Sequence, residues 1–545
     1  MKVFWCSKCQ VPVINETKCK CGNETRYMTT DIRPVFPEEK HLMYKITKDK
    51  LFIEGPVWAA KGFKYFVGER FEAVSLNSLV PIINEKEIVN YLNNLDLNDE
   101  YLEFNKNIQK FVEVNSKHLH VIEFAAMDFI KNAVKQYPSN LPVVSFSGGK
   151  DSTVVSHLVR RALSNPSILH LFGDTTLEFP FTYKYIERFR RDNPRTPFFT
   201  SRSNHNFMDL CQKMGPPSRV MSWCCTVFKT GPLNNTINNF AKGKNLLTFY
   251  GIRGSESVTR RDYQKVEFNN FDFIKNSEIT SSPKIAKQKV TSPIFDWYDV
   301  EVWLYILSHN VDFNDGYRLG FSRVGCWCCP NNSKWSMVLA SIYMPEQYKQ
   351  WNDFLINFAK RIGKKDAELY VATGKWKARQ GGAGLDNRQI HVEAKPCIDE
   401  EFSRTFTLTK PINDELYEYF KPFGKVSKEL GRKLLNEVVI IDKKTNKQIL
   451  KLQGKAGTYN LKVVAINPSN YRLLSQRIDC QLRKFQSCIG CLGCVSICPN
   501  GAISYVDGTY RIIENKCLGE KCLACINPWR GGCLMSKVLA VKRGV

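Results

Sequence analysis

The segment SFSGGKDSTVV, residues 145–155, decides the fold expected for the middle of the chain. It ends an apolar run, LPVVSFS at 141–147, that is typical of a buried strand. It leads into STVVSHLVRRAL at 152–163, where apolar residues recur at helical spacing. Glycines between a strand and a helix let backbone N–H groups point at an anion, and the helix N-terminus adds partial positive charge. The segment therefore predicts a phosphate-binding turn, with Lys150 and neighbouring hydroxyl groups as further donors.

The residues from 141 to about 340 alternate between strand and helix patterns. SILHLFGD at 167–174 and LLTFYGIRG at 246–254 predict two more buried strands, and VEVWLYILS at 300–308 predicts a helix. This alternation indicates an α/β fold with a doubly wound parallel sheet that binds ligands at the carboxyl ends of its strands. A predicted helical segment, roughly 106–137, precedes the first strand and ends before Pro138.

The turn resembles the S-G-G-x-D-S loop of the PP-loop ATP pyrophosphatases, and it lacks the longer Walker A pattern. The residues that carry this likeness are Ser147, Gly148, Gly149, Lys150, Asp151 and Ser152. Further segments resemble, in the right order, motifs of the phosphoadenosine-phosphosulfate (PAPS) reductase family. They are LHLFGDTTLEFPFTYKY (169–185), WCCTVFKTGPL (223–233), YGIRGSESVTRR (250–261), SPIFDWYDVEVWLYI (292–306) and GYRLGFSRVGCWCCP (316–330). The resemblance covers about 200 residues.

The resemblance implies roles for individual residues. The loop 147–152 and Asp174 would line a site for ATP with Mg²⁺, and Lys229, Arg253 and Arg260 would bind phosphate or sulfate oxygens. Lys150, Asp151 and Arg253 would take part in catalysis, and Glu256 would orient Arg253. For Arg253 and Arg260 the alternative is that they are solvated charges at helix ends.

Two cysteine pairs in the same region resemble iron–sulfur ligands of the adenylylsulfate-reducing branch of that family. They are Cys224-Cys225 and Cys326-x-x-Cys329, which together could hold one [4Fe–4S] cluster, with zinc as the rival metal. Cys328 lies inside the second pair. It is either a thiol that handles sulfur during catalysis or a packed spare cysteine.

The C-terminal region contains the most specific signal in the chain. Cys488, Cys491, Cys494 and Cys498-Pro499 have the spacing of bacterial ferredoxins, in which the fourth cysteine serves a second cluster. With that cross-over, cluster one would use Cys488, Cys491, Cys494 and Cys533. Cluster two would use Cys517, Cys522, Cys525 and Cys498, at less regular spacing. Three clusters in all are thus expected, with an external low-potential electron donor, and such oxygen-labile groups suggest an anaerobe.

The N-terminal residues 1–25 predict a zinc ribbon. Cys6, Cys9, Cys19 and Cys21 form two close pairs that can present four thiolates to one tetrahedral Zn²⁺ ion. The segment has too few apolar residues for a core of its own, so the metal would supply its folding energy. MKVFWCSKCQ lacks the features of a signal peptide, and no apolar run of membrane-spanning length occurs. We therefore expect a cytoplasmic protein, in which clustered cysteines bind metals rather than form disulfides.

Five regions are expected. They are a zinc ribbon (1–25), a small β-rich module (26–105), a PP-loop PAPS-reductase-like domain with a cluster (106–345), a basic α+β region (346–467) and a ferredoxin-like domain (468–545).

The net charge of +25 favours a nucleic acid partner, tRNA or DNA, although a lysine-rich genome would also explain it. Between residues 421 and 465 lie 11 Lys and Arg residues against three acidic ones. Trp376, between Lys375 and Lys377, is either a base-stacking platform or a core tryptophan.

The intact loop bears on the reaction. Sulfonucleotide reductases of the family carry a degenerate loop and a C-terminal Glu-Cys-Gly segment, whereas this chain keeps the loop and lacks that tripeptide. The combination looks like that of DNA-phosphorothioation and tRNA-thiolating enzymes. We therefore expect adenylylation of an acceptor, followed by sulfur transfer from a sulfur donor. The alternatives are a reductase of adenylylsulfate or PAPS, and a non-catalytic electron-transfer or iron–sulfur scaffold protein.

Overall fold

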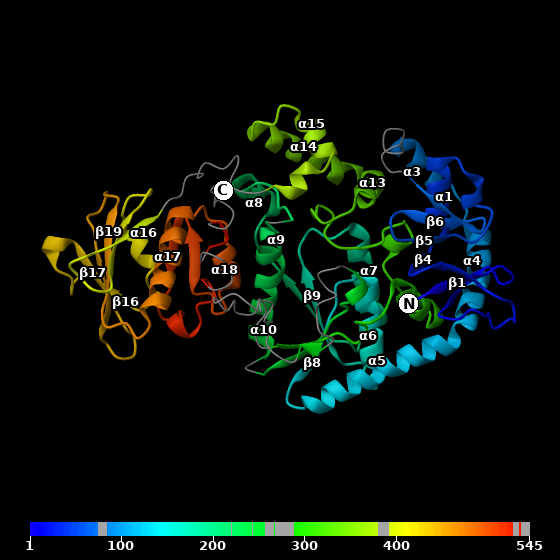
Figure 1. Cartoon of the computed structure of the whole chain (residues 1–545), viewed down its shortest axis with the longest axis horizontal. Coiled ribbons are helices and arrows are strands. Elements are labelled where there is room, and N and C mark those ends of the chain that lie inside the picture. Colours follow the sequence, from blue (N-terminus) through cyan, green and yellow to red (C-terminus); the bar gives the residue numbers. More distant parts are fainter. Residues whose placement is uncertain are drawn as a thin grey trace. The chain divides into compact units, whose positions relative to one another are not determined.

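A computed structural model describes residues 1–74, 84–219, 221–241, 244–256, 266–267, 288–379, 392–526 and 533–535 (Figure 1). The chain forms two compact units. Unit 1 comprises Met1–Ser201, Gly243–Asn269 and Lys287–Asn352. Unit 2 comprises Arg202–Lys242, Asn270–Ala286 and Asp353–Val545. Among the helices that the structure describes, none has both the length and the apolar character needed to span a bilayer.

A six-stranded sheet of order β10-β9-β8-β11-β13-β12 forms the centre of the α/β region. The pairs β8–β9, β8–β11 and β11–β13 are parallel, and the short edge strand β12 is antiparallel to β13. The fold is therefore α/β with a parallel sheet, as expected from the sequence. The strands are β8 (Leu141–Ser145), β9 (Leu169–Asp174), β10 (Phe198–Arg202), β11 (Leu246–Phe249), β12 (Val266–Glu267) and β13 (Gln288–Thr291).

The strand order creates a switch point between β8 and β11. From β8 the chain proceeds to β9 and β10 on one side, and then returns to β11 and β13 on the other. The loops that follow β8 and β11 consequently leave the sheet side by side. Open α/β sheets bind ligands at such a point, outside the carboxyl ends of the strands.

Helices pack around this sheet. α6 (Lys150–Ala162) begins directly after the predicted turn and buries Val154, Val155, Leu158 and Val159 in the main core of unit 1. The other helices that lie wholly in unit 1 are α1 (Pro37–Thr47), α3 (Glu85–Asn93), α4 (Asn98–Val114), α5 (Ser116–Gln136), α7 (Pro180–Asp192), α12 (Asp299–Ser308) and α13 (Lys334–Tyr343). α14 (Pro345–Arg361) begins in unit 1 and ends in unit 2.

The segment 106–137, predicted as one helix, belongs to two. Asn115 separates α4 from α5, and its side chain is buried. Its Oδ1 accepts a hydrogen bond from the Ile14 N–H at 2.8 Å, and its Nδ2 donates to the Pro12 carbonyl at 2.9 Å. The break therefore ties the helices to the N-terminal strands, a contact that helical periodicity does not reveal.

Two small antiparallel sheets complete unit 1. The first, of order β2-β1-β3, contains β1 (Val3–Cys6), β2 (Val11–Ile14) and β3 (Arg26–Thr29). The second contains β4 (Ile32–Pro34), β5 (Trp58–Ala60), β6 (Lys64–Val67) and β7 (Arg70–Ala73). The expected β-rich module at 26–105 thus has strands, but it also holds α1, α3 and the start of α4.

Unit 2 contains an antiparallel six-stranded sheet of order β14-β15-β19-β18-β17-β16 and a hairpin. The sheet strands are β14 (Glu393–Pro396), β15 (Ser403–Thr407), β16 (Lys425–Ser427), β17 (Glu437–Ile441), β18 (Gln448–Gln453) and β19 (Asn460–Ala465), and the hairpin is β20 (Ile503–Val506) with β21 (Thr509–Ile512). Its helices are α8 (Phe207–Met214), α9 (Trp223–Cys225), α10 (Gly231–Ala241), α15 (Ala367–Ala372), α16 (Asp414–Glu418), α17 (Tyr471–Ser487) and α18 (Gly493–Ile497). One hydrophobic core joins this sheet to α17 and the hairpin.

Candidate functional site

The turn between β8 and α6 is closed by its own hydroxyl groups. The Ser147 N–H donates to Ser152 Oγ at 3.1 Å, and Ser152 Oγ donates to the Gly149 carbonyl at 2.8 Å. Gly148 has φ of +73°, a conformation in which glycine is favoured. The Lys150 N–H donates to Tyr317 Oη at 2.9 Å. The sequence therefore produces a compact turn at the start of a helix, which is the local structure that phosphate binding requires.

Two buried cations and two carboxylates meet beside this turn. Lys150 Nζ lies 3.2 Å from Asp151 Oδ2 and 3.1 Å from Asp299 Oδ1. Arg253 Nε donates to Asp151 Oδ1 at 2.6 Å, and its Nη2 donates to Asp299 Oδ1 at 3.0 Å. Lys150 and Arg253 are each 4% exposed. The switch point thus brings the loop after β8, the loop after β11 and the start of α12 into one ion network.

Charge coupling keeps this network ionised. Burial opposes the charge of Lys150, but the carboxylates of Asp151 and Asp299 outweigh burial and raise the pKa of the lysine. Burial likewise opposes the charge of Asp299, yet Lys150 and Arg253 lower its pKa. Nearby Asp31 has its pKa raised to about 6 by burial and by the charge of Asp299.

Arg253 is not a solvated helix-end charge, so that alternative is wrong for this residue. Its guanidinium lies 4.0 Å from Glu256 Oε1, farther than from Asp151 and Asp299, which make the closer ion pairs. The second arginine of the pair, Arg260, lies outside the described residues.

Sequence reasoning missed Asp299 and Tyr317 as members of this site. Both lie in segments that resemble family motifs, Asp299 in SPIFDWYDVEVWLYI and Tyr317 in GYRLGFSRVGCWCCP. Asp299 is the first residue of α12, where an acidic side chain is favoured by the helix dipole. Because that local preference already accounts for an acidic residue, the sequence does not reveal that Asp299 belongs to the site.

The loop after β9 brings a carboxylate and a thiol to the same edge of the sheet. Asp174, 1% exposed, accepts hydrogen bonds from the Thr176 N–H at 2.8 Å and from Tyr183 Oη at 2.9 Å. Thr175 Oγ1 donates to Glu178 Oε1 at 2.8 Å and lies 3.3 Å from Cys326 Sγ. The cysteine pair that begins with Cys326 therefore starts beside the carboxyl end of β9.

The four cysteines predicted for the core cluster fall in different units. Cys326 and Cys329 belong to unit 1, whereas Cys224 and Cys225 lie on α9 in unit 2. Their joint ligation of one cluster stays a prediction. Cys328 is 4% exposed, which favours the packed role over sulfur handling. Lys229 is exposed in unit 2, on the π-helical turn η3 (Thr226–Thr230) that continues α9.

The N-terminal cysteines converge on one point. The Sγ atoms of Cys6, Cys9, Cys19 and Cys21 all lie within 4.8 Å of one another. The pair Cys6–Cys21 is separated by 3.7 Å and the pair Cys9–Cys19 by 3.8 Å. A tetrahedral zinc ion with Zn–S bonds of about 2.3 Å places its sulfurs about 3.8 Å apart. The residues therefore fit a structural zinc ion.

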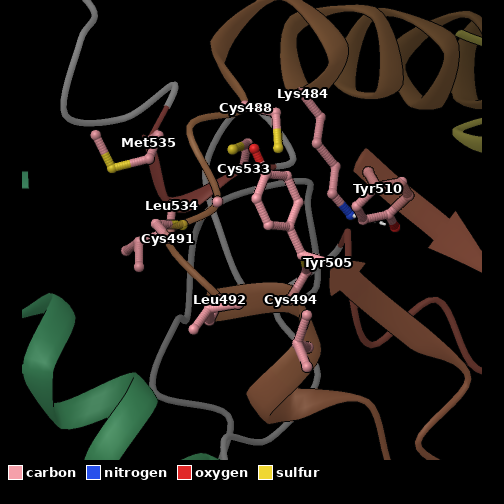
Figure 2. A pocket seen from close by; sticks show the side chains of 12 residues that line it. Lys484, Cys488, Cys491, Leu492, Cys494, Tyr505, Tyr510, Cys533, Leu534 and Met535 are labelled. Atoms are coloured by element: carbon pink, nitrogen blue, oxygen red, sulfur yellow. Dashed lines mark hydrogen bonds between the residues drawn. The ribbon is translucent and has the colours of Figure 1, made fainter. Parts of the chain in front are cut away.

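Two cavities in unit 2 are each lined by four cysteines. Cys488, Cys491, Cys494 and Cys533 surround the first cavity, together with Lys484, Tyr505 and Tyr510 (Figure 2). Cys498, Cys517, Cys522 and Cys525 line the second. These are the two cysteine sets that the cross-over pattern predicts. Sulfur-only donor sets of this kind suit iron–sulfur clusters or zinc.

In the basic region the structure differs from the sequence prediction at one residue. Trp376 is 2% exposed, so it is a core tryptophan and the prediction of a stacking platform is wrong. Several cations of 421–465 have carboxylate partners, among them Lys421 with Glu418 at 2.7 Å and Lys462 with Glu400 at 2.7 Å. Other lysines of this segment are exposed, namely Lys425, Lys433, Lys443, Lys444, Lys447 and Lys455.

Comparisons with known proteins point to two domain families. The family model described as "Phosphoadenosine phosphosulfate reductase domain" matches residues 141–332. The model described as "4Fe-4S binding domain" matches residues 485–504.

Two uncharacterized proteins of Methanocaldococcus jannaschii are 29% and 28% identical to this chain over 269 and 312 residues. These alignments cover 49% and 56% of this chain, and 52% and 69% of the relatives, so the chain spans only about half of the first one. An adenosine 5'-phosphosulfate reductase of Bacillus cytotoxicus is 28% identical over 206 residues, which is 37% of this chain and 79% of the relative. A crystal structure of phosphoadenylyl-sulfate reductase from Candida auris aligns at 16% identity and a TM-score of 0.28, over 40% of this chain and 95% of that one.

Proposed function

Since the chain carries a phosphoadenosine phosphosulfate reductase domain and a 4Fe-4S binding domain, we propose that it is an ATP-using iron–sulfur enzyme that adenylylates an acceptor and then replaces the activated oxygen with sulfur. ATP with Mg²⁺ is the nucleotide, and the acceptor is a nucleic acid. Sulfide is the sulfur donor.

The observation that carries this proposal is the intact turn at the switch point of the sheet. Ser147–Ser152 keeps every residue of the ATP-splitting loop, and Lys150 and Arg253 are fixed beside it by Asp151 and Asp299. A sulfonucleotide reductase releases no pyrophosphate, so it has no need of such a turn. The turn supports a substrate that brings a triphosphate.

The bonding changes of the proposed reaction indicate a role for each residue of the ion network. An acceptor oxygen attacks the α-phosphorus of ATP, a new P–O bond forms, and the α–β phosphoanhydride bond breaks to release pyrophosphate. Lys150 and Arg253 would neutralise charge that develops on the phosphates, which fixed cations in a dry site do well. Asp151 and Asp299 hold both cations until the nucleotide and its Mg²⁺ arrive. The sulfur nucleophile then bonds to the acceptor, and AMP leaves with the former acceptor oxygen.

The metal groups would be held by the cysteine sets described above. Cys6, Cys9, Cys19 and Cys21 would hold a structural zinc ion, and the two cysteine-lined cavities of unit 2 would hold two [4Fe–4S] clusters. Cys224, Cys225, Cys326 and Cys329 would hold a third cluster. When bound, the clusters supply one-electron reduction from an external low-potential donor.

Charge supports the nucleic acid acceptor. The net charge is +25, and exposed lysines such as Lys433, Lys444 and Lys447 lie in the basic region. Phosphate contacts from lysine give most non-specific affinity for nucleic acids. Trp376 makes no contribution to base stacking because it is buried.

A turnover assay tests the proposal. The protein, purified and reconstituted without oxygen, is expected to convert ATP into AMP and pyrophosphate when it is given an RNA or DNA pool. Lys150→Ala is expected to lower that rate by about 10²-fold or more, while iron and zinc contents stay unchanged. Lys184→Ala, at an exposed lysine of α7, is the matched control with normal turnover. Wild-type protein that never releases pyrophosphate with any pool contradicts the proposal.

The second candidate is a ferredoxin-linked sulfonucleotide reductase. It is favoured by the 28% identity to an adenosine 5'-phosphosulfate reductase over most of that relative. The discriminating measurement supplies adenylylsulfate or PAPS with a low-potential reductant and assays sulfite. Sulfite release without pyrophosphate release from ATP would establish the reductase.

A further inference from the structure

Lys484 is a buried cation in the wall of the first cysteine-lined cavity. It lies near the end of α17 (Tyr471–Ser487), on the face that also buries Gln481, Leu482 and Phe485. Its side chain is 2% exposed. Lysine is almost never buried to this extent without a charged partner, so we expect a negatively charged group close to its ammonium group.

The described residues that Lys484 contacts through Nζ offer it only uncharged groups. Nζ donates to Tyr510 Oη at 3.2 Å and lies 5.0 Å from the centre of the Tyr510 ring (Figure 2). It also donates to the Cys525 carbonyl at 3.4 Å. Among the described residues, no carboxylate comes within ion-pair distance of Nζ. Two weak hydrogen bonds do not offset the several kcal/mol that burial of an ammonium group costs.

Lys484 lies between the two cysteine sets. It lines the first cavity beside Cys494 and Cys533, and it bonds to the backbone of Cys525, which belongs to the second set. Since the described residues place no carboxylate at Lys484, a thiolate-bound cluster in the first cavity and one bound through Cys525 would supply the negative charge that its ammonium group needs.

We propose that Lys484 is the shared internal counter-ion of the two [4Fe–4S] clusters, and that its ammonium charge makes both clusters easier to reduce. A cluster gains one negative charge on reduction, and a fixed cation in a region of low dielectric stabilises that form more than the oxidised one. Lys484 is thus a positioning residue for charge and does not bind the metal. The inference depends on cluster binding in these two cavities and not on the reaction with ATP.

The test is a reductive titration of Lys484→Met in the full-length, anaerobically reconstituted protein, followed by electron paramagnetic resonance. Methionine has a similar length and no charge. At a fixed potential, the ratio of reduced to oxidised cluster is expected to fall at least about tenfold for both clusters, which is a shift of 59 mV for a one-electron couple. Iron content shows whether the variant carries its clusters.

Two control variants test whether the charge of Lys484 causes the shift in potential. Lys484→Arg keeps the charge and is expected to hold both potentials near the wild-type values. Lys521→Met removes an exposed lysine beside Cys522 and is expected to change the potentials far less, because water screens that charge.

If Lys484→Met binds no iron, Lys484→Gln is titrated in its place, since its amide can still donate a hydrogen bond to Tyr510 Oη. Unchanged potentials in a fully loaded neutral variant overturn the proposal. A shift in only one cluster overturns the shared role. Failure of ATP turnover with normal potential shifts would reject the proposed function and leave this inference intact.

Discussion

Lys150 and Asp299 show how much of this site depends on single residues. Lys150 was predicted to reach a phosphate, and in the structure its ammonium group rests between two carboxylates. Arg253 makes the same two contacts from the other loop of the switch point. The cations are therefore held ready in a charge-balanced network rather than exposed to solvent.

The environment of His170 in unit 1 predicts that acid lowers the stability of the fold. Burial lowers the pKa of His170 to about 4, from the ordinary value of 6.5. Its ring lies between the Ser156 hydroxyl at 2.7 Å and the Ile168 carbonyl at 2.8 Å, so the neutral form is fully bonded. As pH falls from 7 to 5.5 the unfolded imidazole takes up a proton and the folded one does not. Stability is lost in that window, by about 1 kcal/mol for this residue.

Urea denaturation of unit 1 signals at pH 7 and pH 5.5 measures the effect. His170→Gln, whose amide can replace both hydrogen bonds, is expected to reduce the loss between the two pH values by that amount. His120→Gln, at an exposed position of α5, is the control. An equal pH dependence in wild type and His170→Gln would contradict the assignment.

At the scale of elements, the approach of β11 to α6 sets the geometry of the site. Gly251 follows β11, and a Cβ atom there would lie 2.7 Å from the Asp151 carbonyl carbon and 2.8 Å from the Ser152 nitrogen. The strand end therefore rests on the first turn of α6, and only a residue without a side chain allows Arg253 to reach Asp151.

Gly251→Ala is expected to push the two loops apart and to cost about 1–3 kcal/mol. Pyrophosphate release should fall strongly, while zinc and iron contents stay normal because no metal ligand lies at this contact. Gly55→Ala, where nothing lies within 4 Å of the added carbon, is the matched control for thermal stability and turnover. Normal turnover in Gly251→Ala would show that the contact does not set the geometry of the site.

The elements that sequence patterns predicted are those with strong local signals. β8, α6, β9, β11 and α12 combine an apolar period with a turn at a defined residue, and the structure has each of them. The helix break at Asn115 was missed because its cause is a bond to residues 12 and 14, about 100 positions away. Asp299 was missed because its local role at the start of α12 already explains an acidic residue there. Burial of Trp376 between basic neighbours likewise depends on the tertiary fold.

At the scale of the whole molecule, the metal content tests how the cysteines are divided among the predicted metal sites. If all predicted sets are filled, the reconstituted chain is expected to hold about 12 iron atoms in three cubes and about one zinc ion. The double variant Cys224→Ser/Cys225→Ser is expected to hold about 8 iron atoms, because only the third cluster draws on these residues. Cys397→Ser, outside every predicted set, serves as the control. Unchanged iron in the double variant would remove the core cluster from the proposal.

The hydrophobic core that the sheet of unit 2 shares with α17 and the hairpin limits which genetic variants are informative. Phe406 and Leu452 of the sheet pack in one hydrophobic cluster with Phe485 of α17 and Tyr510 of the hairpin. Tyr419 stacks on Tyr510 with ring centres 4.3 Å apart, and Gln486 Oε1 accepts from the Thr409 and Lys410 N–H groups at 2.7 Å.

The region that contains the 4Fe-4S domain match is therefore not an independently folding part of unit 2. A truncation near residue 467 would strip the sheet of its apolar cover, and the remaining protein would aggregate or be degraded. A strain with that truncation would thus resemble a complete deletion, and only point substitutions at the cysteines can separate loss of the proposed clusters from loss of the protein.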